Sequence, residues 1–149
     1  MFSVILSNYN GGDFLEEALL SVAQQDYASF EFIVVDDGST DGSRAIIDSV
    51  AARFPTIVRT FFKETNEGQA AGFNAGFHLA QGNIVCFIDS DDRWFSDKLT
   101  RLARLAEEEP GCAIYQHNLY KLVNDVVTGE KFRDVVQTGD LLAYTQRTR

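Results

Sequence analysis

Three aspartates fall within four consecutive residues, Asp89-Ser90-Asp91-Asp92, directly after an apolar run. At this spacing their carboxylates would repel one another unless a positive charge lay between them. Mg²⁺ and Mn²⁺ take oxygen ligands and keep positions open for substrate phosphates, so Asp89 and Asp91 are the candidate metal ligands. Asp92 fits a structural role best, because an aspartate at such a turn can also cap a helix.

A second acidic pair, Asp36-Asp37, stands before the polar turn Gly38-Ser39-Thr40-Asp41. A carboxylate here could accept hydrogen bonds from a nucleobase N–H or from ribose hydroxyls, but aspartates are also common turn formers. Tyr9, in an earlier polar segment, could stack on a base or could belong to the rim of the core. Both questions stay open from these residues alone.

The elements that would position these residues alternate between strand-like and helix-like patterns, which predicts an α/β fold with a mostly parallel sheet and helices on its faces. Strands are predicted at residues 2–6, 30–35, 57–62 and 84–88. The helices between and after them include one capped by Asp13 and one that ends before Pro55, with others at 69–80 and 96–108. The fourth strand is continuously apolar, which predicts a central position, buried on both faces.

After the last of these helices the pattern changes. Residues 112–123 and 126–133 predict an antiparallel hairpin around Asn124-Asp125, and a further helix is predicted from Thr138. The hairpin could cover a sheet edge or offer it to a partner, so a homo-oligomer stays possible.

Each polar cluster lies in the loop that follows a predicted strand. In an open parallel sheet, ligands bind beyond the carboxyl ends of the strands, where the connecting loops converge. We therefore expect four loops to line one rim and to form a single binding site. Their residues are Asn8-Tyr9-Asn10, Asp36-Asp37, Asn66 with Gly68, and Asp89 to Asp92.

Composition narrows the classes of function. With 149 residues, the chain is expected to form one domain, and its formal net charge of -9 without any Lys/Arg run argues against nucleic-acid binding. A divalent cation would reconcile this acidity with a phosphate-bearing ligand.

No apolar run approaches the about 20 residues of a transmembrane segment, so a cytoplasmic location is expected. Cys86 and Cys112 are expected to be reduced core residues.

The chain resembles the family-2 glycosyltransferases in four motifs that follow one another in the same order. They cover roughly the first hundred residues. These motifs are Ser3-Val4-Ile5-Leu6-Ser7-Asn8-Tyr9-Asn10, Val34-Val35-Asp36-Asp37-Gly38-Ser39-Thr40-Asp41, Asn66-Glu67-Gly68-Gln69 with Asn74-Ala75-Gly76, and Asp89-Ser90-Asp91-Asp92.

The resemblance implies the GT-A fold, a nucleotide-diphosphate-sugar donor with UDP as the expected nucleotide, and Mg or Mn held by the Asp-x-Asp element. It implies a role in cell-wall or polysaccharide biosynthesis, with an unknown saccharide, lipid or protein acceptor, and allows peripheral attachment at the inner membrane. Position by position, Tyr9 with Asp36 and Asp37 would contact the base, Asp89 the ribose side, and Asp91 the metal. Ser7, Asn66, Gly68 and Ser90 complete the predicted nucleotide-sugar-binding set.

Two positions depart from the family pattern: its usual proline in the first motif is Ser7, and the basic residue often found before the second asparagine is Phe73. In this family an Asp or Glu from the second half of the domain is the general base on the acceptor hydroxyl. The chain ends about where that half should begin. We therefore expect residues 1–149 to be the donor-binding part, with the general base outside this chain.

Two other functions remain alternatives. A sugar nucleotidyltransferase usually has a glycine-rich, basic phosphate loop after its first strand, whereas residues 7–12 contain no Lys or Arg. A non-catalytic nucleotide-sugar-binding module would bind the donor without turnover. The P-loop and dinucleotide-binding motifs are both absent from the sequence.

Overall fold

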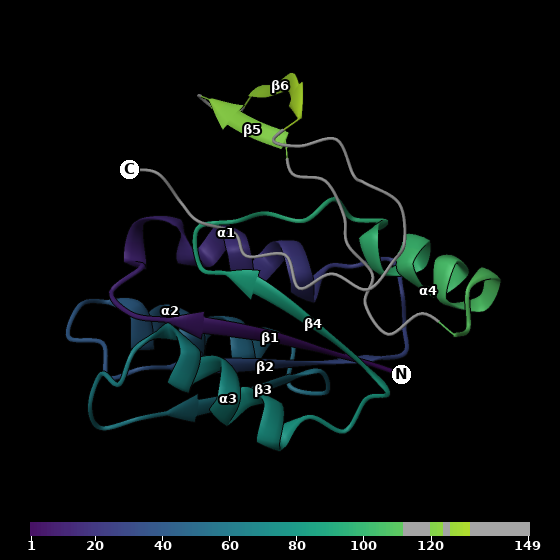
Figure 1. Cartoon of the computed structure of the whole chain (residues 1–149). Coiled ribbons are helices and arrows are strands. Elements are labelled where there is room, and N and C mark those ends of the chain that lie inside the picture. The colour runs from purple at the N-terminus through teal and green to yellow at the C-terminus, as the bar shows by residue number, and fades with distance from the viewer. Residues whose placement is uncertain (112–119, 124–125, 132–149) are drawn as a thin grey trace. The chain divides into compact units, whose positions relative to one another are not determined.

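The computed structural model (Figure 1) describes residues 1–111, 120–123 and 126–131 of the chain. Its main sheet has four parallel strands in the order β3-β2-β1-β4. These strands are β1 (Phe2–Asn8), β2 (Phe30–Asp36), β3 (Val58–Phe62) and β4 (Ile84–Asp89). The helices are α1 (Gly12–Ala23), α2 (Ser43–Arg53), α3 (Gln69–Leu79) and α4 (Lys98–Glu108).

Helices cover both faces of the sheet, as the sequence predicts. Every residue of β1 and β2 is buried, and successive side chains point to opposite faces. Val4 and Val34 belong to the core cluster that contains the buried apolar residues of α1 and α2. Ile5, Ile33 and Val35 pack instead with apolar residues of α3, which lies on the other face (Figure 1). The prediction of a mostly parallel α/β fold is confirmed.

The predicted central position of β4 is not seen among the described residues. Among the described residues β4 pairs only with β1 and stands at an edge of the sheet, and its Phe87 is 49% exposed. An apolar run favours a strand, but strand order depends on the crossovers between strands. Here β1, β2 and β3 lie side by side in chain order. The connection through α3 then leads to β4, which lies on the opposite side of β1 from β2.

The predicted cap of α1 is wrong. Gly11, and not Asp13, is the N-cap residue of α1, and as a glycine it provides no side chain to cap the helix. Asp13 lies inside the first turn, where its negative charge is favourable beside the positive end of the helix dipole. The Gly12 amide donates to Asp41 Oδ2 at 3.2 Å, so this helix start is joined to the loop after β2.

The chain divides into two compact units, Met1–Ala103 and Arg104–Arg149. The first holds the four-stranded sheet. The second holds β5 (Tyr120–Val123) and β6 (Val126–Lys131), which pair antiparallel, so the predicted hairpin is confirmed for these residues. The predicted helix from Thr138 lies outside the described residues. In the part of the chain that the structure describes, no helix has both the length and the apolar character needed to cross a membrane.

Candidate functional site

Strand register brings the predicted site residues to one edge of the sheet. In the parallel ladders Asn8 lies beside Asp36, Asp36 beside Phe62, and Ser7 beside Asp89. The strands therefore end at nearly the same level, and the loops that follow them start from a common rim. This confirms the expected convergence of the polar loops, and all of these residues lie within the first compact unit.

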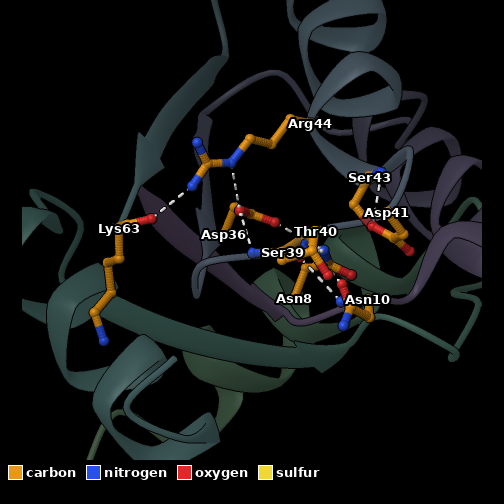
Figure 2. Close-up of polar contacts among 9 residues, drawn as sticks. All are labelled: Asn8, Asn10, Asp36, Ser39, Thr40, Asp41, Ser43, Arg44 and Lys63. Atoms are coloured by element: carbon orange, nitrogen blue, oxygen red, sulfur yellow. Dashed lines mark hydrogen bonds and ion pairs between the residues drawn. The ribbon is translucent and has the colours of Figure 1, made fainter. Parts of the chain in front are cut away.

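Asp36 joins three segments of this rim (Figure 2). Its Oδ2 accepts a hydrogen bond from Asn8 Nδ2 at 3.0 Å, and its Oδ1 accepts bonds from the Ser39 amide at 3.0 Å and Arg44 Nε at 3.1 Å. Arg44 Nη2 also donates to the Lys63 carbonyl at 2.6 Å. Because Asp36 is fully buried and both of its oxygens are engaged, its observed contacts are those of a residue that holds the loops together.

The loop after β1 is fixed on both sides of Tyr9. The Asn10 amide donates to Ser39 Oγ at 2.9 Å, and Asn10 Oδ1 accepts from the Thr40 amide at 2.9 Å (Figure 2). Asn10 has a φ of 51°, a left-handed conformation that asparagine tolerates better than most residues. Tyr9 itself is 49% exposed, so its ring is presented at the rim and is not part of the core.

Asp37 connects the loop after β2 to the start of α3. Its Oδ2 accepts hydrogen bonds from the amides of Glu67 at 3.1 Å and Gly68 at 2.7 Å, while Lys63 Nζ lies 2.5 Å from its Oδ1. Burial by itself raises the pKa of the Asp37 carboxyl, but these hydrogen bonds outweigh it and hold the pKa below the ordinary 3.8. The bond to Asp37 is the main reason that the pKa of Lys63 is raised above 10.5.

The start of α3 carries the predicted residues Asn66 and Gly68. Asn66 Oδ1 accepts a bond from the Gly68 amide at 2.8 Å, and Gly68 is the N-cap with a φ of 93°, which glycine adopts without strain. The next residue, Gln69, donates from Nε2 to Asp89 Oδ1 at 2.7 Å. Two predicted motifs, on α3 and at the end of β4, are thus joined directly.

Ser7 lies beneath α3. Its side chain is buried, and a Cβ placed on Gly72 would come within 2.0 Å of Ser7 Oγ. The side chains of Asn8 and Ser90 also lie close to a glycine, Gly11. A Cβ added to Gly11 would lie 2.5 Å from Asn8 Oδ1 and 3.0 Å from Ser90 Oγ. Asn8 Oδ1 is buried without a hydrogen-bond partner in the described part of the chain. A donor at this point, from water or a ligand, would satisfy it.

The aspartates after β4 differ in their surroundings. Asp91 is exposed and Asp89 is half-buried, while Asp92 lies near the Lys98 ammonium, which sits 3.9 Å over the Trp94 ring. Burial lowers the pKa of Lys98 to about 8, with Cys86 and Asp92 acting in the opposite direction. Trp94 is partly buried and packs against the main core. Lys98 therefore supplies local positive charge beside Asp92, and the structural role expected for Asp92 stays a prediction.

The donor atoms at this rim suit a divalent cation bound together with a substrate. Among the described residues no group of three or more His, Cys, Asp or Glu side chains could enclose a metal ion. Two carboxylates, Asp89 and Asp91, would leave coordination positions for substrate phosphates, which is how Mg²⁺ is usually held. The chemistry of the residues present therefore fits such an ion.

The sequence analysis assigned no role to Arg44, Lys63 or Gln69, although Gln69 is the last residue of the Asn66–Gln69 motif. Lys63 directly follows β3 and Gln69 starts α3, so both stand at the same rim as the predicted residues. For Lys63 the available signal was its position directly after a strand, but a single Lys is more typical of an ordinary surface position. For Gln69 the signal was its place at the end of the third motif. Only the fold shows that they contact Asp37 and Asp89.

The glycosyl transferase family 2 profile matches residues 3–141, and the chain belongs to this family. One relative is the putative teichuronic acid biosynthesis glycosyltransferase TuaG of Bacillus subtilis, 34% identical over 89% of this chain and 52% of its own. The chain spans about a quarter to a half of the length of the curated relatives it matches.

Two solved structures show the same GT-A type fold. S. aureus TarS 1-349 in complex with UDP-GlcNAc has a TM-score of 0.70 and 31% identity over 87% of this chain and 37% of its own. The mannosyltransferase PcManGT from Pyrobaculum calidifontis, in complex with GDP-Man and Mn²⁺, has a TM-score of 0.66 and 29% identity, covering 70% of this chain and 32% of its own.

Proposed function

We propose that this chain is the donor-binding part of a glycosyltransferase that transfers a sugar from a nucleotide-diphosphate donor, with UDP as the nucleotide, to an acceptor not yet identified. The observation that carries the proposal is the convergence of four motif loops on one rim of the parallel sheet, with direct hydrogen bonds between them. Support also comes from the nucleotide sugars in the complexes of TarS and PcManGT.

In this proposal the exposed ring of Tyr9 stacks on the base, and the Asp36 and Asp37 pair acts at the base end by holding the loops around it. Asp89 and Ser90 take the ribose side, and Asp91 with Asp89 holds Mg or Mn. When bound, such a cation would place positive charge against the departing diphosphate. Ser7 lies at the bottom of the proposed donor site, and Asn66 and Gly68 shape the start of α3. We assign no general base to this chain.

The test is calorimetric titration of UDP with and without Mn²⁺. Asp91→Ala should lose the Mn²⁺-dependent binding, whereas Asp48→Ala, an exposed aspartate on α2, should bind as the unchanged chain does. Binding that is absent, or that does not respond to Mn²⁺ or to Asp91→Ala, would rule out this site. Because TuaG is named for teichuronic acid biosynthesis, teichuronic acid oligosaccharides are the first acceptors to try with a longer chain.

Turnover separates the enzyme from a binding module. We expect this chain alone to bind donor and metal but to transfer sugar poorly; efficient transfer to any acceptor would contradict that expectation. A sugar nucleotidyltransferase would instead release pyrophosphate from UTP and a sugar 1-phosphate. The loop after β1 argues against this alternative, because residues 7–12 offer no Lys or Arg to the phosphates. The cytoplasmic location, with peripheral attachment to the inner membrane, and homo-oligomer formation stay predictions.

A further inference from the structure

The contact between Gln69 and Asp89 links two elements that are distant in the chain. Gln69 is the first residue of α3, and Asp89 is the last residue of β4. Gln69 Nε2 donates to Asp89 Oδ1 at 2.7 Å. A hydrogen bond to a carboxylate is stronger than one between neutral groups, so it restricts how the carboxylate can rotate.

The backbone that carries Gln69 is itself held in place. The Gly68 amide donates to buried Asp37, and Asp37 is paired with Lys63, whose side chain is only 11% exposed. On the other side, α3 lies so close to β1 that a Cβ on Gly72 would overlap Ser7. The first turn of α3 therefore has little freedom to move along the sheet.

The chemistry of an amide suits this position. A lysine or arginine here would add a positive charge beside Asp89, whereas the amide of Gln69 donates a hydrogen bond without adding charge. A carboxylate held in this way is oriented but keeps its own negative charge for a ligand. Partners that hold a metal-binding carboxylate commonly affect metal affinity about 10- to 100-fold.

We propose that Gln69 is a positioning residue of the donor site, whose side-chain amide orients the Asp89 carboxylate for the cation and the diphosphate sugar. The proposal rests on the proposed function of this rim. It adds a residue outside the predicted binding set, on the strength of its observed contact with Asp89.

The first test replaces Gln69 with methionine, which keeps the length of the side chain but has no hydrogen-bond donor. We expect Gln69→Met to weaken Mn²⁺-dependent UDP binding about tenfold in calorimetry. The matched control is Gln24→Met, at the exposed C-cap of α1, which should change neither affinity nor melting temperature. An affinity of Gln69→Met within about twofold of the unchanged chain would overturn the proposal, since the effect expected from lost orientation is several times larger.

The second test separates orientation of Asp89 from a general loss of structure. The Kd for UDP is measured with Mn²⁺ and again in EDTA, at millimolar UDP, and the ratio of the two values gives the gain in affinity that the cation provides. We expect Gln69→Met to reduce this gain about tenfold and to leave the Kd in EDTA nearly unchanged, because only the cation-dependent contact is disturbed. Equal weakening under both conditions would mean that Gln69 supports the structure of the loop alone, and would overturn the proposal.

The two proposals fail in different ways. If the unchanged chain does not bind UDP with Mn²⁺, the proposed function fails, whatever the Gln69 variants do. If the unchanged chain binds and Asp91→Ala does not, while Gln69→Met binds normally, only the role of Gln69 is wrong.

Discussion

Lys63 and Asp37 form an ion pair that joins the end of β3 to the turn after β2, with 2.5 Å between Nζ and Oδ1. The Asp37 side chain is only 1% exposed, and two backbone amides of the loop before α3 also donate to it. A carboxylate with these partners is favoured in its ionised form. The pair therefore links the stability of the rim to pH.

The folded-state pKa of Asp37 is lower than its ordinary value of 3.8, so its contribution to stability is complete above that value. It is lost as the pH falls below 3.8 and through the lower folded-state pKa. We expect Asp37→Asn to be less stable at neutral pH and to lose less stability on acidification than the unchanged chain. Urea unfolding at neutral pH and at a series of pH values on either side of the ordinary pKa measures the difference, and parallel curves for the two proteins would contradict it.

The close approach of α3 to β1 predicts a steric effect at Gly72. Because an added Cβ would lie 2.0 Å from Ser7 Oγ, we expect Gly72→Ala to cost about 1–3 kcal/mol in the free energy of unfolding. Adding Ser7→Ala should recover part of this loss, because it removes the nearest atom. Gly42→Ala is the control, since Gly42 has a φ of -74° and nothing lies within 4 Å of a Cβ there. Equal effects of the two glycine substitutions would argue against the tight packing.

Cys86 should react slowly in the folded protein. Burial raises the pKa of its thiol from 9.0 to about 11, although nearby Lys98 lowers it. Since the thiolate is the reactive form, alkylation by iodoacetamide in mildly alkaline buffer should be about 100-fold slower than in the urea-unfolded chain. The rate is measured in a Cys112→Ser background so that one thiol is followed. Similar rates in the folded and unfolded states would contradict the expected burial effect.

Tyr9 predicts an effect on binding without an effect on folding. Its ring is 49% exposed, so Tyr9→Ala should leave the melting temperature nearly unchanged. If the ring stacks on the base, the same change should weaken UDP binding about tenfold or more, as for other base–aromatic stacks. Tyr9→Phe keeps the ring and should bind normally. Unchanged affinity of Tyr9→Ala would place the base elsewhere.

Several features of the fold could be predicted because their signals are local. The apolar runs and the helical periodicity place the strands and helices close to their observed bounds, and the polar loops follow the strands. The parallel arrangement then makes Asp36 and Asp89 share a rim, since carboxyl ends of parallel strands lie at one edge. The predicted start of α3 at Gln69 also agrees with the structure.

By itself, the sequence determined the order of the elements, the motif residues and the edge of the sheet where they gather. Only the tertiary structure decided that β4 stands at the edge of the sheet formed by the described residues, that Gly11 replaces Asp13 as the N-cap of α1, and which residues pair across the rim. The contacts of Lys63 with Asp37 and of Gln69 with Asp89 join segments 26 and 20 residues apart. Such pairings depend on the crossovers and on the close packing of α3, and no local pattern of residue types contains that information.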